Sequence, residues 1–131
     1  MEKNFYLRSA LSVILLMHSV VSIFSGDVNN FGLLYLDTLG FSPFGLYLAW
    51  IVKLIHLFSV FVIWSDRYVK LVSICNIVIL LLGIYFVHWQ NGWYVVGGGT
   101  NGIEFNVLLI CCFLQLYFTE FPLRQKENCR L

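Results

Sequence analysis

The sequence predicts an all-α membrane protein, a four-transmembrane-helix bundle with both termini cytoplasmic. Of its 131 residues, 60% are hydrophobic and only 11% are charged, which leaves too few charged side chains to cover a soluble globule. Four apolar segments approach the roughly 20 residues that a helix needs to cross a bilayer. Lys and Arg are concentrated in alternate connections, and this placement sets orientation in a membrane.

The predicted helices span residues 7–24, 44–64, 69–87 and 103–118. The first could be mistaken for a secretory signal, because Lys3 and Arg8 precede an apolar run. Ile23 and Ser25, however, do not form a small-x-small cleavage site. We therefore expect the first helix to be retained and residues 1–131 to form a single transmembrane domain.

The basic residues at or beyond the ends of the apolar segments predict the orientation. They lie before the first helix, between the second and third, and after the fourth: Lys3, Arg8, Arg67, Lys70, Arg124, Lys126 and Arg130. Residues 25–43 and 89–102 contain no Lys or Arg, so these connections are expected to face outward. Apolar residues interrupt the first of them, which predicts a short interfacial helix there. Trp64, Tyr68 and Trp89 fit aromatic belts at the two interfaces.

Lys53 is the one basic residue inside a predicted span, and His56 follows one helical turn later on the same face. A charge at the bilayer centre costs about 2.5–3.5 kcal/mol on insertion scales, so we expect the pair to face the bundle interior with partners. At about 1.5 Å per residue, both lie roughly 12–17 Å below the outer surface. That depth makes it hard for the Lys53 ammonium to reach an interface.

His18 lies roughly 10 Å deep by the same count, at the edge of a serine face suited to close helix packing: Ser12, Ser19 and Ser22. Taken alone, His18 also fits a core histidine bonded to a carbonyl or a serine. With the other ionisable residues it predicts a polar pocket open to the outer side, with Trp93 or Tyr94 at its mouth. Its lining would be His18, Lys53, His56, His88 and Glu104.

Several uses of such a pocket remain open from the residues alone. It could pair charges, relay protons, hold a metal, or bind the polar head of a quinone or lipid. Three histidines on separate helices have no diagnostic ligand spacing, and the Lys53 ammonium would oppose a cation. We therefore expect no metal. The chain shows no basic surface for nucleic acid.

Gly97, Gly99 and Gly102 match the pattern G-x-G-x-x-G before a helix. No βαβ unit surrounds them, so a dinucleotide site is not supported. We expect instead that the glycines allow a tight backbone path, and that Asn101 and Glu104 form a capping box on the last helix. A carboxylate at the positive end of a helix is already oriented, so this role is compatible with a place in the pocket.

The stretch from residue 88 to 105 carries a family resemblance. His88 is followed by Asn-Gly-Trp-Tyr-Val-Val-Gly-Gly-Gly and then by a Gly-Ile-Glu-Phe run that opens the last helix. This pattern, with an Arg before the first helix and a Gly-Phe-Ser-Pro turn before the second, resembles the DoxX family of small four-helix bacterial membrane proteins. The likeness spans most of the chain. The matching motif positions are His88, Asn91, Gly92, Trp93, Gly102, Glu104 and Phe105.

The DoxX family is named for small subunits linked to a membrane thiosulfate:quinone oxidoreductase. The resemblance therefore implies a multi-pass protein of the bacterial inner membrane, and a quinone-interacting or accessory subunit of an oxidoreductase complex. Lys53 departs from the acidic residue often found at the equivalent place in the family. Residues 119–124 also depart from the family's glycine-rich ending, so no role of that ending is transferred.

Two classes of function follow. In the first, the protein is a quinone-interacting or accessory subunit, and electrons come from a partner or a bound cofactor, because the chain has no cluster, flavin or haem-attachment motif. In the second, it is a non-enzymatic structural or assembly subunit whose buried charges bind a lipid or a partner helix. A small transporter is less favoured, because four short helices enclose little volume. The sequence does not decide whether the protein is an enzyme.

Overall fold

The computed structural model describes residues 4–65, 67–94 and 102–119, and these form helices and turns without a strand, which confirms the all-α prediction. Three helical segments are long and apolar enough to cross a membrane, and a fourth is apolar but shorter. They are Phe5–Phe24, Gly45–Trp64, Val69–Asn91 and Ile103–Thr119. These lengths and compositions indicate a membrane protein, while the four-helix bundle and the cytoplasmic termini stay predictions.

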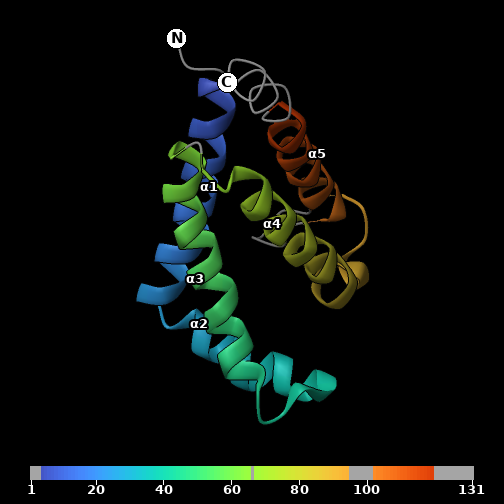
Figure 1. Ribbon diagram of the computed structural model, residues 1–131. Helices are drawn as coiled ribbons and strands as arrows, with labels where there is room; N and C mark the ends of the chain where they lie inside the picture. Colours follow the sequence, from blue (N-terminus) through green and yellow to red (C-terminus); the bar gives the residue numbers. More distant parts are fainter. Residues whose placement is uncertain (1–3, 66, 95–101, 120–131) are drawn as a thin grey trace, which may run out of the picture. The chain divides into compact units, whose positions relative to one another are not determined.

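The chain divides into two compact units, Met1–Trp64 and Ser65–Leu131. In the first unit, α1 (Phe5–Phe24) and α3 (Gly45–Trp64) pack side by side (Figure 1). They run antiparallel, because the start of α1 meets the end of α3. There the Phe5 and Trp64 rings lie 5.7 Å apart, and the Trp64 indole donates a hydrogen bond of 2.9 Å to the Ser12 hydroxyl.

Arg8 has a different position from the one expected. α1 begins at Phe5, so Arg8 lies inside the helix and not before it, and only 3% of its surface is exposed. Its Nη1 donates a hydrogen bond of 2.9 Å to the carbonyl of Ile63, in the last turn of α3. The last carbonyls of a helix lack partners within it, and a cation is favourable at that negative end. Arg8 therefore caps α3, and the prediction that it precedes the first helix is wrong.

The connection between α1 and α3 is helical, as predicted. It consists of α2 (Asp27–Asn30) and a π-helical segment, η1 (Phe31–Phe41), which is interrupted at Gly40 by a positive φ of 100°. The Asp37 carboxylate accepts a hydrogen bond of 3.0 Å from the backbone N–H of Gly45. This bond satisfies one of the free donors at the start of α3. The expected place of the connection in the membrane interface stays a prediction.

Gly32 in η1 lies directly against the backbone of α3. A Cβ at this position would be 2.6 Å from the Cα of Leu46, so a larger residue would force two backbone segments apart. Gly32→Ala is expected to lower the free energy of unfolding by about 1–3 kcal/mol. Gly83→Ala is the control, because a Cβ there meets nothing within 4 Å. Thermal unfolding in detergent, followed by circular dichroism, measures both; equal losses in the two variants would contradict this packing.

In the second unit, α4 (Val69–Gly83) and α5 (Ile103–Thr119) pack side by side (Figure 1). The Lys70 ammonium, at the start of α4, lies 5.8 Å from the ring centroid of Tyr117, near the end of α5, so the two helices are antiparallel. The predicted end of this helix at residue 87 is wrong, because the helical path continues beyond it. It continues through a π-helical segment, η2 (Ile84–His88), and a 3₁₀ turn, η3 (Trp89–Asn91).

Candidate functional site

Three polar side chains come together in the first unit: the buried Lys53 and His56 from α3, and the exposed His18 from α1. The Lys53 ammonium lies 2.9 Å from Nε2 of His18 and 3.3 Å from the His18 carbonyl oxygen. The His18 and His56 rings are 5.4 Å apart, centroid to centroid. Lys53 is 7% exposed and His56 4% exposed, although both are polar. We call this group the Lys53–His18–His56 cluster.

The cluster forms because α1 and α3 each turn a face of small and polar residues toward the interior of the unit. On α3, the buried positions recur at helical spacing, and Ala49 and Ser59 flank the two polar residues. On α1, the buried residues next to His18 include Ser19. Small side chains allow helix backbones to approach closely in a membrane protein. The antiparallel register then sets His18 opposite Lys53, although the His18 side chain is exposed and does not have the inward position that was predicted.

The contact between Lys53 and His18 couples the protonation of the two side chains. An ammonium group only donates hydrogen bonds, so when Lys53 is protonated Nε2 of His18 is the acceptor in the 2.9 Å contact and the ring proton is on Nδ1. Within the described residues, Lys53 has no carboxylate within ion-pair distance. Asp27, at the start of α2, is the acidic residue whose charge acts on it. The Lys53 amine is therefore held by neutral groups, the His18 ring and the His18 carbonyl.

His56 is the unsatisfied member of the cluster. Both of its ring nitrogens are buried, and neither has a hydrogen-bond partner among the residues that the structure describes. A buried polar group without a partner costs about 1–3 kcal/mol. A neutral imidazole has one donor and one acceptor nitrogen. The cluster therefore retains hydrogen-bonding capacity for a molecule that supplies complementary atoms.

The other predicted pocket residues belong to the second unit. His88 ends η2 and is partly buried, and Glu104 lies in the first turn of α5 and is also partly buried. Trp93, expected at the mouth, is 53% exposed. Their membership of one pocket with His18, Lys53 and His56 stays a prediction.

The start of α5 is held by backbone carbonyls from the preceding loop. The N–H of Ile103 donates to the carbonyl of Gly92 at 3.1 Å, and the N–H of Glu104 donates to the carbonyl of Trp93 at 3.0 Å. A Cβ on Gly102 would lie 2.5 Å from that Trp93 oxygen, so only glycine fits there.

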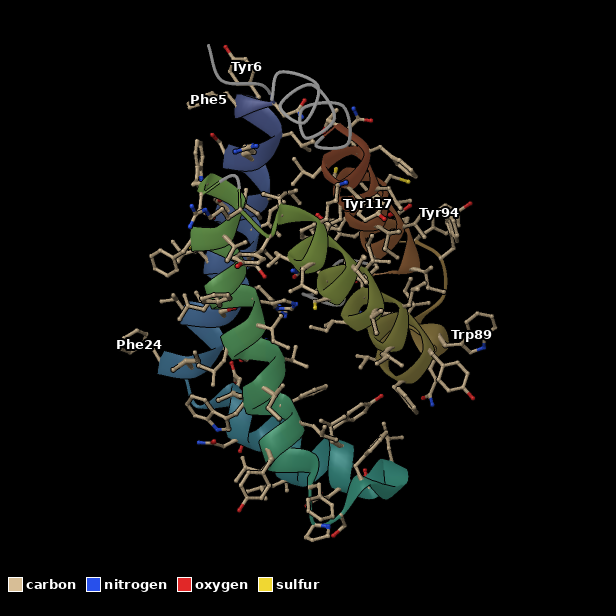
Figure 2. All side chains as sticks on the ribbon, in the orientation of Figure 1. Phe5, Tyr6, Phe24, Trp89, Tyr94 and Tyr117 are labelled. Carbon is tan, nitrogen blue, oxygen red and sulfur yellow. The ribbon has the colours of Figure 1, made fainter. Side chains whose placement is uncertain are left out.

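The remaining predicted motif positions lie on either side of this contact. The Asn91 amide donates to the Val87 carbonyl at 3.4 Å, and Gly92 has a positive φ of 81°. Gly97, Gly99 and Asn101, with the predicted capping role of Asn101, lie outside the described residues. The aromatic residues Trp89 and Tyr94 project outward around this loop (Figure 2), with 68% and 74% of their surfaces exposed.

Two contacts near the cluster were not predicted from the sequence. The Ser25 hydroxyl donates a 2.5 Å hydrogen bond to Asp27, and the Trp50 indole donates one of 2.9 Å to Asn29, which ties α2 to α3. The signal that could have found Asp27 was its position, since it follows the end of the first helix and is one of two acidic residues in that connection.

In the part of the chain that the structure describes, no three His, Cys, Asp or Glu side chains are grouped to hold a metal.

The chain was compared with protein-family models, with curated proteins and with solved structures. No family model, curated protein or solved structure matches it.

Proposed function

We propose that the protein is a multi-pass membrane protein that binds the polar head of a quinone at the Lys53–His18–His56 cluster, as an accessory subunit of a membrane oxidoreductase. The observation that carries the proposal is His56, whose two ring nitrogens are buried without a partner in the described part of the chain, beside a buried ammonium group. Quinone carbonyl oxygens accept hydrogen bonds from such donors. The rest of a quinone is apolar, as is the surrounding helix.

The depth of the cluster supports a lipid-soluble ligand. Lys53 is eight residues from the start of α3 and eleven from its end, or about 12 and 16 Å from the two ends of the helix. A polar solute of the aqueous phase would have to be desolvated to reach it, whereas a membrane-soluble molecule already resides at that depth. Ionisable residues at such depth are by default functional in membrane proteins.

The redox context comes from the resemblance of residues 88–105 to the DoxX family, which also suggests the bacterial inner membrane. Within the proposal, Lys53 and His56 hold the quinone head, and His18 positions the Lys53 ammonium. The chain carries no sequence motif for an electron carrier. A partner protein would therefore deliver or remove the electrons, and this subunit would bind and orient the quinone.

Quinone binding can be measured directly with purified protein in nanodiscs, using a short-chain ubiquinone and the quenching of tryptophan fluorescence. Saturable binding is expected, and Lys53→Met and His56→Met should each weaken it roughly tenfold or more. Phe58→Met is the matched control, because Phe58 lies on the same helix and is 64% exposed. The proposal is wrong if the wild type shows no saturable binding, or if both variants bind as the wild type does.

One observation favours the second candidate, a structural or assembly subunit. His18 is exposed although it lies within an apolar helix long enough to cross the membrane. A polar ring on such a surface is suited to a contact with a partner helix. Co-purification after extraction in a mild detergent separates the two candidates: a redox protein in the complex supports the accessory role, and an envelope-assembly protein supports the structural one.

A further inference from the structure

The charges around Lys53 are unbalanced at short range. Lys53 is a buried cation, and no carboxylate of the described residues forms an ion pair with it. His18 from α1 contacts it, and it interacts electrostatically with Asp27 from α2 and with His56 from its own helix. Of these, only Asp27 is acidic, and it is exposed and accepts a hydrogen bond from Ser25. A buried charge without a close counter-charge is strongly unfavourable.

A negatively charged ligand atom would supply both the counter-charge that Lys53 lacks and the hydrogen-bond partner that His56 lacks. An ammonium group has three N–H donors, and two of them are directed at His18. The third can donate to one ligand oxygen, while the N–H of the His56 ring donates to the same oxygen or to a second one. Hydrogen bonds to an ionised acceptor are roughly twice as strong as those between neutral groups. An oxyanion therefore suits the cluster better than a neutral carbonyl does.

We propose that the cluster selects an apolar molecule whose head is an oxyanion. This inference rests on the ligand site proposed above and defines the class of ligand that it takes. Two sources share this chemistry: the deprotonated hydroxyl of a hydroxyquinone, and the carboxylate of a fatty acid. Either would bring the negative charge that Lys53 lacks and the acceptor atoms that His56 lacks, and would leave its tail in the apolar surroundings.

The test uses two matched pairs of probes. The first pair is an alkyl hydroxynaphthoquinone and its methyl ether; the second is dodecanoate and its methyl ester. Each is titrated into protein in neutral-lipid nanodiscs, at a pH at which both acids are deprotonated, and protein-free nanodiscs correct for partition into the lipid. We expect at least one anion to bind roughly tenfold or more tightly than its neutral partner. Lys53→Met should abolish that preference, while Phe58→Met should retain it.

The outcomes separate this inference from the proposed function. Preferential binding of the hydroxyquinone anion supports both. Dodecanoate binding without any quinone binding supports the oxyanion site and overturns the quinone function. Equal affinity for the neutral and anionic probes overturns the inference and leaves quinone binding in place. If no probe binds, the inference fails, and the ubiquinone titration alone decides the quinone function. Circular dichroism and size-exclusion chromatography establish that Lys53→Met is folded. Lys53→Gln repeats the test with a polar side chain. If both variants still prefer the anionic probe to its neutral partner, the inference is also overturned.

Discussion

The His56→Met variant, in detergent and without ligand, is expected to have a free energy of unfolding about 1–3 kcal/mol higher than that of the wild type. The reason is that His56 is 4% exposed, and neither ring nitrogen has a partner within the described residues. Methionine is flexible, fills irregular space and has no polar group that needs a partner. Denaturant or thermal unfolding, followed by circular dichroism, measures the difference. A residue that lowers the stability of the ligand-free protein is expected where that residue is needed to bind a ligand.

Ligand should stabilise the wild type more than His56→Met. Quinone at roughly 100 times the wild-type Kd stabilises the wild type by about 2.7 kcal/mol, and a variant that binds tenfold more weakly by only about 1.4 kcal/mol. Phe58→Met places the same new residue on an exposed part of α3 and should behave as the wild type in both conditions. If ligand-free His56→Met were instead less stable than the wild type, the imidazole would be satisfied within the protein, and the argument for a ligand would lose its basis.

Replacing Arg8 with methionine should lower the free energy of unfolding by about 2–3 kcal/mol. The change removes a buried, charge-assisted hydrogen bond to the Ile63 carbonyl and leaves that oxygen at the end of α3 without its donor. It also removes a cation from the negative end of the helix. Thermal unfolding of the purified variant measures the loss.

Two variants serve as comparisons for Arg8→Met. Arg8→Lys keeps the charge and one flexible donor, so an intermediate loss is expected. Val13→Met introduces methionine at a position of α1 that is 60% exposed and should have little effect. If Arg8→Met were as stable as the wild type, the Arg8 contact would not contribute to the packing of α1 on α3.

The helix positions could largely be predicted from the sequence. The predicted spans 44–64 and 103–118 each differ by one residue from the observed Gly45–Trp64 and Ile103–Thr119. The reason is that each apolar run has nearly the length of a membrane span and is bounded by residues that interrupt helices. The change of α4 into π-helical and 3₁₀ segments was not predictable in this way, because hydropathy reports the length of a run and not its helical pitch.

The core of the site was predictable because polar residues are rare in these helices. Lys53 and His56 share a face by their spacing, and His18 was expected to meet them; the structure places it 2.9 Å from Lys53. The contact of Arg8 could not be foreseen, because its partner is a backbone carbonyl and has no signature in the sequence. The predicted link to His88 and Glu104 depends on how the two units are arranged, which residue spacing does not define.

The central claim is that a ligand satisfies the buried nitrogens of His56, and a high-resolution density map tests it most directly. The protein should be purified from its native membrane in a mild detergent, without added ligand. The claim predicts non-protein density with an oxygen atom about 2.7–3.2 Å from the Lys53 ammonium and from a ring nitrogen of His56. A well-ordered map in which both ring nitrogens of His56 bond only to protein atoms or to water would contradict it.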